Sequence, residues 1–319
     1  MAEFAAPTLR DIHTASARIA AHARVTPVLR SAELDALAGA TLLFKCEHLQ
    51  VGGAFKFRGA CNAVWSLDDD EAGRGVVTHS SGNHGAALAL AARTRKIPAH
   101  IVVPEGAVAA KLANIERAGG ILHRCAPTQA AREEACEKVQ RETGATLVHP
   151  YADARVMAGQ GTIVLELLQQ IPHLDTVIVP IGGGGLASGC AIALAALSPQ
   201  ARLVGAEPAG ANDAFRSLQR GQRITDIVPH TICDGLRATI GEPNFALLGA
   251  HRVEVITVDD AATLAAMRLV WAELKQTIEP SSAVVLAALL AQRERFAGQR
   301  VGLVLSGGNV DLDALPFAA

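Results

Sequence analysis

The sequence predicts an α/β protein built from parallel sheets that helices cover on both faces. Short runs rich in valine and isoleucine alternate with longer alanine- and leucine-rich stretches of helical pattern. This alternation is typical of parallel sheets, because two parallel strands need a long crossover between them. A chain of 319 residues is long enough for two domains or for one large α/β domain.

Eight segments are expected to form strands, since each is a short apolar run bounded by glycine, proline or polar residues. They are residues 42–46, 75–79, 99–103, 121–124, 176–180, 202–206, 252–257 and 300–305. Helical periodicity is clearest at residues 83–94, 108–118, 129–142 and 261–276. The rhythm of these elements predicts a small inserted α/β domain at residues 68–151 and a large domain made of residues 1–67 and 152–319.

The composition excludes several functional classes. A net charge of −2 gives no electrostatic reason to expect nucleic acid or an anionic membrane as a partner. Six scattered cysteines without a Cys-x-x-Cys motif favour reduced thiols in a cytoplasmic protein over disulfides or zinc. The apolar stretch at residues 283–291 is too short to span a bilayer and is expected to be a core helix.

Lys56 is the first candidate for chemistry. It stands in Gly-Gly-Ala-Phe-Lys-Phe-Arg-Gly-Ala at residues 52–60, between two phenylalanines and several small residues. Burial in such a setting lowers the pKa of the amine, and a neutral amine can form a Schiff base with an aldehyde. Most lysines are exposed, so Lys56 alone does not indicate catalysis.

A second motif is Ser-Ser-Gly-Asn-His-Gly at residues 80–85, directly after an apolar run. The amides and the dipole at the start of the following helix attract an anion such as a substrate carboxylate. Ordinary N-capping explains any one of these residues but not their combination.

Four consecutive glycines, Gly182, Gly183, Gly184 and Gly185, form the third motif, between an expected strand and an alanine-rich helix. Without Cβ atoms their amides can close on an oxyanion, so this loop predicts a phosphate site.

The fourth motif is Ser306-Gly307-Gly308-Asn309, after the last expected strand. A serine at that edge can face a ring held over the sheet, although an ordinary turn is the favoured explanation of this motif on its own.

Two alternatives from other classes fit part of this pattern. Gly182-x-Gly184-x-x-Ala187 matches the dinucleotide fingerprint, and Glu207 follows about 20 residues later, where a ribose-binding acid belongs. A nicotinamide-dependent dehydrogenase leaves Lys56 and the turn at residues 80–85 without a role. A non-catalytic protein that binds a small molecule gives no reason for a lysine in apolar surroundings.

Taken together, the four motifs resemble the fold-type II pyridoxal-phosphate enzymes, in the branch of serine racemase and the catabolic serine/threonine dehydratases. The resemblance runs from about Pro27 to Leu312 and includes His149-Pro150, residues 158–162 and Ile278-Glu279-Pro280. It implies two three-layer α/β domains of the tryptophan synthase β type, pyridoxal 5'-phosphate as cofactor, an amino acid as substrate and a homodimer.

The resemblance also implies roles for the cofactor-binding residues. Lys56, flanked by Phe55, would be bonded to the cofactor and later move the Cα proton, and the glycine loop would bind the phosphate. Asn83 would hydrogen-bond the ring hydroxyl, and Ser306 would face the pyridine nitrogen. Because a serine does not hold a proton on that nitrogen, the ring is a weaker electron sink, which favours loss of a β-leaving group over transamination.

Further positions match the substrate and metal sites of such enzymes. Ser81 resembles an acid/base group on the opposite face of the ring. Ser80, His84, Arg132 and Ala238 match positions that contact the substrate.

In the serine racemase-like members a metal site involves the residues that match Glu207, the carbonyl of Ala211 and Asp213. Oxygen ligands suit a hard ion such as Mg²⁺ or Ca²⁺, which would be structural and activating.

The resemblance implies a dehydratase, or ammonia-lyase, that converts a β-hydroxy-α-amino acid to a 2-oxo acid and ammonia. A serine or aspartate racemase is the alternative on the same residues.

The sequence departs from the relatives at three places, which are Gly52-Gly53-Ala54, Ala238 and Tyr151. These departures suggest a roomier pocket that accepts an aryl group, as in phenylserine. Arg132 and Arg237 instead suit a second carboxylate, as in 3-hydroxyaspartate, so both substrates stay open.

Overall fold

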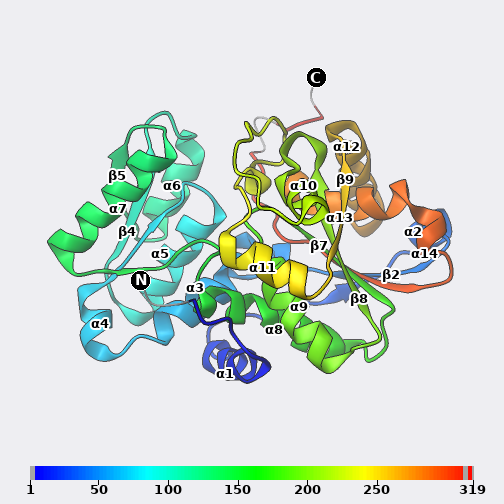
Figure 1. Cartoon of the computed structure of the whole chain (residues 1–319), viewed down its shortest axis with the longest axis horizontal. Coiled ribbons are helices and arrows are strands. Elements are labelled where there is room, and N and C mark those ends of the chain that lie inside the picture. Colours follow the sequence, from blue (N-terminus) through cyan, green and yellow to red (C-terminus); the bar gives the residue numbers. More distant parts are fainter. Residues whose placement is uncertain (1–3, 312–314, 318–319) are drawn as a thin grey trace.

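A computed structural model describes residues 4–311 and 315–317, so Leu312 and the outermost residues of the predicted large domain lie outside the described part. The chain forms two sheets, a six-stranded one in the order β1-β2-β10-β7-β8-β9 and a four-stranded one in the order β5-β4-β3-β6. Figure 1 shows them as two lobes side by side. All neighbouring strands are parallel except β1 and β2. The predicted α/β class with two parallel sheets is confirmed.

Every predicted strand is present, with bounds within two residues of those expected. The large sheet contains β1 (Val28–Leu29), β2 (Thr41–Lys45), β7 (Thr176–Pro180), β8 (Arg202–Pro208), β9 (Glu254–Val258) and β10 (Arg300–Val304). The small sheet contains β3 (Val76–His79), β4 (Ala99–Pro104), β5 (Ile121–Cys125) and β6 (Thr146–Leu147). The sequence did not predict β1 and β6, because strands of two residues are too short to show a period.

The helices follow the alternation expected from the sequence. The helices before β8 are α1 (Leu9–Ile19), α2 (Ala32–Ala38), α3 (Lys56–Trp65), α4 (Asp69–Arg74), α5 (Asn83–Arg95), α6 (Ala109–Arg117), α7 (Gln129–Thr143), α8 (Ala154–Gln170) and α9 (Gly185–Leu197). They are followed by α10 (Asp213–Arg220), α11 (Glu242–Ala250), α12 (Asp260–Leu269), α13 (Pro280–Ala291) and α14 (Arg293–Phe296). No helix within residues 4–311 and 315–317 is long and apolar enough to cross a membrane.

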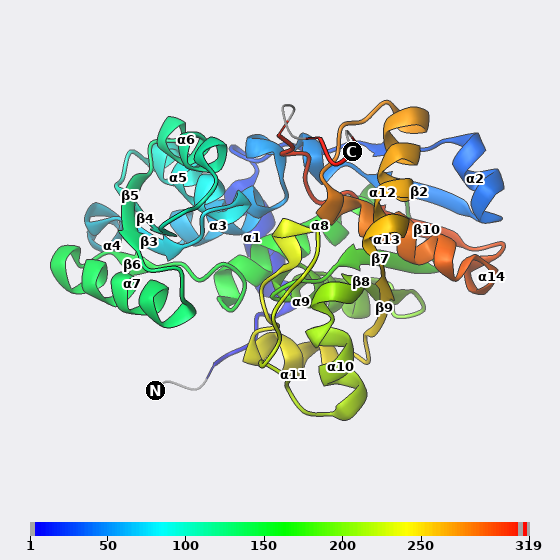
Figure 2. The same ribbon diagram turned by 90° about the horizontal axis from the view of Figure 1, so that it is seen from above.

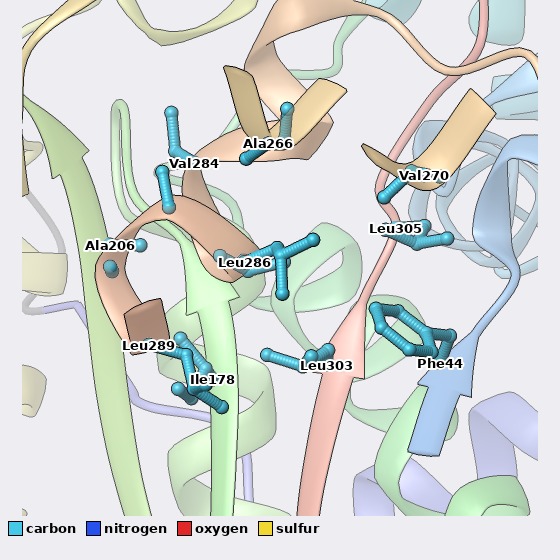
Figure 3. Packing of buried hydrophobic residues seen from close by; sticks show 14 of the residues in the cluster. Phe44, Ile178, Ala206, Ala266, Val270, Val284, Leu286, Leu289, Leu303 and Leu305 are labelled. Atoms are coloured by element: carbon cyan, nitrogen blue, oxygen red, sulfur yellow. The ribbon is translucent and has the colours of Figure 1, made fainter. Parts of the chain in front are cut away.

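Helices cover both faces of the large sheet. Leu42 and Phe44 of β2 pack in one hydrophobic cluster with α12 and α13, whereas Leu43 between them packs with α1, α8 and α9 on the other face. Figure 3 shows the first cluster, in which Leu286 of α13 points toward the strands that carry Ile178 and Leu303. Alternate residues of each strand therefore enter different layers, as the pleat of a β-strand requires.

The small sheet is also covered on both faces. Val76 and Ile101 pack with α3, α5 and α6, while Val77 and Val102 pack with α7. Helix α3 contributes Phe57 to the first of these clusters, so a helix from residues 1–67 packs on the small sheet. Figure 2 shows α3 and α8 between the two sheets. The domain bounds at residues 68 and 151 stay a prediction.

The helix expected at residues 261–276 is shorter than predicted. The α-helix ends at Leu269, and one π-helical segment, Val270–Leu274, follows it. Lys275 then takes a left-handed φ of 56°, which ends the helical run. The indole of Trp271 donates to the carbonyl of Ile278 at 3.1 Å and holds the chain just before α13.

Candidate active site

The candidate site lies where β7 and β10 run side by side. Helix α9, which follows β7, packs on one face of the sheet, and α13, which precedes β10, packs on the other. In parallel sheets ligands bind beyond the carboxyl ends of two neighbouring strands whose connections take opposite faces. The glycine loop follows β7 and Ser306 follows β10, so the fold places both motifs at this point.

The glycine loop is a cradle of unpaired amides. No described residue accepts a hydrogen bond from the amide of any glycine in residues 182–185. A Cβ at Gly183 would overlap the ring of Tyr151, and one at Gly184 would come within 2.7 Å of Asn244 Cβ. Gly184 also has a φ of 92°, which disfavours any other residue. The loop therefore needs glycine both for its backbone and for its close packing.

Lys56 opens α3 next to this cradle. Its Nζ donates to the carbonyl of Pro150 at 2.9 Å and lies 5.2 Å from the centroid of the Phe55 ring. Tyr151, the neighbour of Pro150, lies against Gly183, which links the lysine to the glycine loop. Burial lowers the pKa of Lys56 to about 8, as an apolar setting does for an amine.

Buried charges anchor the first turn of α3. Arg58, two residues after the lysine, donates from Nε and Nη2 to both oxygens of Glu47 at 2.7 and 2.8 Å. It also pairs with Glu166 of α8, which in turn lies 3.3 Å from Lys45 Nζ. A bidentate arginine pair of this kind fixes orientation as well as charge.

A second polar group lies beyond β10. Ser306 is 3% exposed, and its Oγ lies 3.2 Å from Ser282 Oγ. Its carbonyl accepts from the amide of Phe55 at 2.9 Å, so the residue before Lys56 is tied to this loop. Asn83 Nδ2 donates to both carboxylate oxygens of Glu279, at 3.0 and 3.2 Å. Glu279 belongs to a segment that carries the family resemblance, but the sequence indicated no role for its side chain.

The residues expected at the substrate lie on the small-sheet side. Ser80 and Ser81 connect β3 to α5, and Ser80 Oγ accepts from the amide of Gly82 at 3.4 Å. His84 is buried, with Nε2 3.3 Å from the carbonyl of Val148 and Nδ1 without a described partner. Burial holds the pKa of His84 well below its usual value.

Arg132 lies on α7, which packs on the small sheet. Its buried Nε has no described hydrogen-bond partner, and the charge of Arg132 contributes to the lowered pKa of His79, after the larger effect of burial. The His79 ring contacts that of His149 at 5.2 Å, and His149 contacts Tyr151 at 4.6 Å. The three rings thus connect His79 to the glycine loop, and the charge of Arg132 acts on the first of them.

The three residues expected to hold a metal lie beside the glycine loop. Glu207 is the last residue but one of β8 and accepts from the amides of Ala214 and Phe215 at 3.0 and 2.9 Å. Asp213 accepts from the amide of Ile240 at 2.6 Å. Burial raises the pKa of Glu207 to about 8 and that of Asp213 to about 6. Ala211 lies between the two acids in a short 3₁₀ turn.

The departures expected to enlarge the pocket have other structural roles. Gly52 and Gly53 have φ values of 75° and 73°, so glycine supplies a left-handed backbone there. A Cβ at Gly53 would overlap the Asn309 side chain, and that side chain donates to the carbonyl of Gly52 at 2.9 Å. Ala238 is half-buried in the loop after Leu236, which contacts Gly182. Neither Gly52 nor Gly53 adds empty space.

Comparison with known proteins identifies this arrangement. A family model described as pyridoxal-phosphate dependent enzyme matches residues 19–307. The chain belongs to this family. It is 48% identical to the β-hydroxyaspartate dehydratase of Paracoccus denitrificans over 98% of this chain and 99% of that protein. It is also 48% identical to the serine racemase of Arabidopsis thaliana over 97% of this chain and 95% of that one. The structure of maize serine racemase superimposes with a TM-score of 0.95 at 46% identity, covering 97% of this chain and 95% of that one.

The residues present fit pyridoxal phosphate. The amides of residues 182–185 are free to bind its phosphate, and Lys56 has a lowered pKa that leaves its amine reactive. The dinucleotide alternative is wrong, because the family match is to pyridoxal-phosphate enzymes. Glu207, moreover, turns its carboxylate to the amides at the start of α10 rather than to the glycine loop. The homodimer and the cytoplasmic location stay predictions.

We expect the capture of added pyridoxal phosphate by the cofactor-free protein to speed up as the pH rises, with a midpoint near the Lys56 pKa of about 8. Only the neutral amine attacks an aldehyde, and its fraction at pH 7 is about a tenth, against roughly one in three thousand for an ordinary lysine. Stopped-flow absorbance of the visible band of the lysine-bound cofactor measures the rate.

The Lys56→Ala variant is expected to show no such band at any pH. Lys138→Ala, on the exposed face of α7, is the matched control and should behave as the wild type. A visible band that persists in Lys56→Ala contradicts the assignment of the lysine.

Proposed function

We propose that the protein is a dehydratase that converts a β-hydroxy-α-amino acid with a second carboxylate, of the 3-hydroxyaspartate type, to a 2-oxo acid and ammonia. The observation that carries the proposal is Arg132. It forms no ion pair with a carboxylate among the described residues, and its buried Nε has no partner. A buried donor without a partner costs free energy, and a carboxylate from the substrate removes that cost.

The α-carboxylate has a separate place at the start of α5. No described residue accepts from the amides of Asn83, His84 or Gly85. The free amides of a helix of 13 residues and its dipole favour an anion at this end. With the α-carboxylate held there, Arg132 is available for the second carboxylate. The relative from Paracoccus denitrificans is named for β-hydroxyaspartate, which supports the same substrate class.

Lys56 carries the proton transfer at Cα in this proposal. Bound pyridoxal phosphate supplies the electron sink that makes the Cα proton acidic. Lys56, neutral above a pH of about 8, removes that proton. The Cα electrons then form a double bond to Cβ as the β-hydroxyl leaves with its bonding pair and takes up a proton, so that it departs as water. The enamine that remains of the amino acid is protonated at Cβ to an imine, and water hydrolyses this imine to the 2-oxo acid and ammonia.

Arg132→Ala should lower kcat/KM for 3-hydroxyaspartate by about 100-fold, because it removes a charged hydrogen bond in a buried site. The same change should lower kcat/KM for serine, which lacks the second carboxylate, by less than about threefold. Steady-state release of 2-oxo acid from each substrate measures both effects.

Arg141→Ala is the matched control, since Arg141 lies on the same helix and is exposed. It should leave both substrates unaffected. If Arg132→Ala slows both substrates equally, Arg132 binds the α-carboxylate and the proposed selectivity is wrong.

A racemase is the second candidate, because serine racemase is as similar to this chain as the dehydratase is. Racemisation needs an acid on the ring face opposite Lys56, and Ser81 is the residue proposed for that face.

Ser81→Ala should abolish interconversion of the D- and L-enantiomers while lowering elimination from the L-substrate by less than about tenfold. Chiral chromatography after incubation with each enantiomer measures the first effect, and release of 2-oxo acid measures the second. Equal losses in the two reactions contradict the assignment of one proton-transfer group to each face.

A divalent cation is proposed at Glu207, the carbonyl of Ala211 and Asp213. The two carboxylates are buried, and no described lysine or arginine pairs with either of them. Carboxylate and carbonyl oxygens are the ligands that Mg²⁺ and Ca²⁺ prefer. The amide of Ile240, from which Asp213 accepts, belongs to the loop whose Gly241 amide donates to the carbonyl of Gly183 at 3.1 Å. An ion at this position would stabilise the glycine loop and would not contact the reacting carbons of the substrate.

Adding Mg²⁺ or Ca²⁺ to chelator-treated protein should raise the melting temperature by about 5 °C at roughly a hundredfold excess over Kd. Glu207→Gln should remove this response, and the exposed Asp226→Asn should retain it. A melting temperature that does not change with either ion rules out the site.

A further inference from the structure

Glu279 is a buried carboxylate that the roles given so far do not use. It is 5% exposed and precedes α13 directly. Its oxygens accept two kinds of hydrogen bond, from Asn83 Nδ2 at 3.0 and 3.2 Å and from the backbone amide of Asn309 at 3.1 Å. A Cβ at Gly307 would come within 2.7 Å of Glu279 Oε1, so the loop after Ser306 closes over it. Burying a carboxylate costs free energy unless hydrogen bonds compensate for the lost water, so its position in the site indicates a function.

The side chain of Asn83 is held at both ends. Its Nδ2 faces Glu279, and its Oδ1 accepts from Asn309 Nδ2 at 2.9 Å. Asn309 Nδ2 also donates to the carbonyl of Gly52 at 2.9 Å, so both of its hydrogens are engaged. An ionised carboxylate only accepts hydrogen bonds, so the NH₂ end of Asn83 must point toward Glu279. The two oxygens of one carboxylate lie too close together to receive one hydrogen each from an NH₂ group, so they share one Nδ2 hydrogen of Asn83, and the other hydrogen is left for another acceptor.

We propose that Glu279 is a positioning residue for the cofactor: it fixes the amide of Asn83 so that the remaining N–H donates to the ring oxygen of pyridoxal phosphate. The inference rests on the proposed contact between Asn83 and that oxygen, and it is independent of the substrate. A fixed donor stabilises the form of the bound cofactor whose ring oxygen is anionic. This is the form that absorbs visible light.

Burial raises the pKa of Glu279, while the hydrogen bonds from Asn83 and Asn309 and the charge of Lys111 lower it. Lys111 itself pairs with Asp234. The acceptor role of Glu279 requires the ionised form, which the two donors favour. The hydrogen bonds from Asn83 and Asn309 therefore favour the ionised carboxylate, and the ionised carboxylate in turn keeps both donors in place.

Glu279→Gln is the first variant. A glutamine places an NH₂ group opposite either Asn83 Nδ2 or the Asn309 amide, so two donors face each other and the direction of Asn83 is no longer fixed. We expect the ratio of visible to near-ultraviolet absorbance of the bound cofactor to fall about tenfold, and its dissociation constant to rise by a similar factor. Absorption spectra during titration of cofactor-free protein measure both. Glu242→Gln, at an exposed position, is the matched control.

The double variant Glu279→Gln with Asn83→Asp distinguishes the positioning of the Asn83 N–H from an effect on the stability of the fold. The introduced glutamine can then donate to the introduced aspartate, which still accepts from Asn309, so the melting temperature should return to that of the wild type. The visible band should not return, because a carboxylate at position 83 has no N–H for the ring oxygen. If the band is unchanged in Glu279→Gln, or returns in the double variant, the proposal is wrong. These readouts use the cofactor alone, so failure of the dehydratase assignment with any substrate leaves them unaffected.

Discussion

The active site depends on the insertion of β10 between β2 and β7. The last strand of the chain pairs in parallel with both, Leu303 lying opposite Phe44 on one side and Ile178 on the other. Because the site groups follow the carboxyl ends of these strands, three distant segments meet at one edge of the sheet. The isolated bridge between Ala54 and Gly307 then ties the segment that carries Lys56 to the loop after β10. Loss of this pairing would separate the lysine, the glycine loop and Ser306.

The charged groups of the site fall into two sets, those that pair with one another and those without a carboxylate partner among the described residues. The paired groups around Arg58 are fully engaged with one another and hold α3 in place. Lys56 and Arg132 lack a carboxylate partner among the described residues. A lysine that donates only to a carbonyl keeps a lowered pKa, since no nearby anion stabilises its ammonium form. The unpaired groups are therefore those that a ligand can engage.

The sequence was sufficient for the fold class and for the individual motifs, but not for the contacts between them. Strands of four or more residues were predictable because β-branched runs bounded by turns mark them, whereas β1 and β6 are too short to leave a pattern. The glycine loop was predictable because four glycines have few other uses. The contacts of Glu279 were not predictable, since one of its two donors, Asn83, lies 196 positions away in the sequence. For the same reason the sequence did not show that Asn309, from the other end of the chain, fills the space beside Gly53.

The contact between Tyr151 and Gly183 has a consequence for attempts to redesign this enzyme by directed evolution. A side chain at Gly183 and the aromatic ring at Tyr151 would occupy the same volume, so no other residue fits at Gly183 while Tyr151 is unchanged. Libraries that randomise Gly183 alone will therefore sample mostly misfolded variants. A smaller residue at Tyr151 with the glycine loop unchanged instead frees the volume that the ring fills against Gly183.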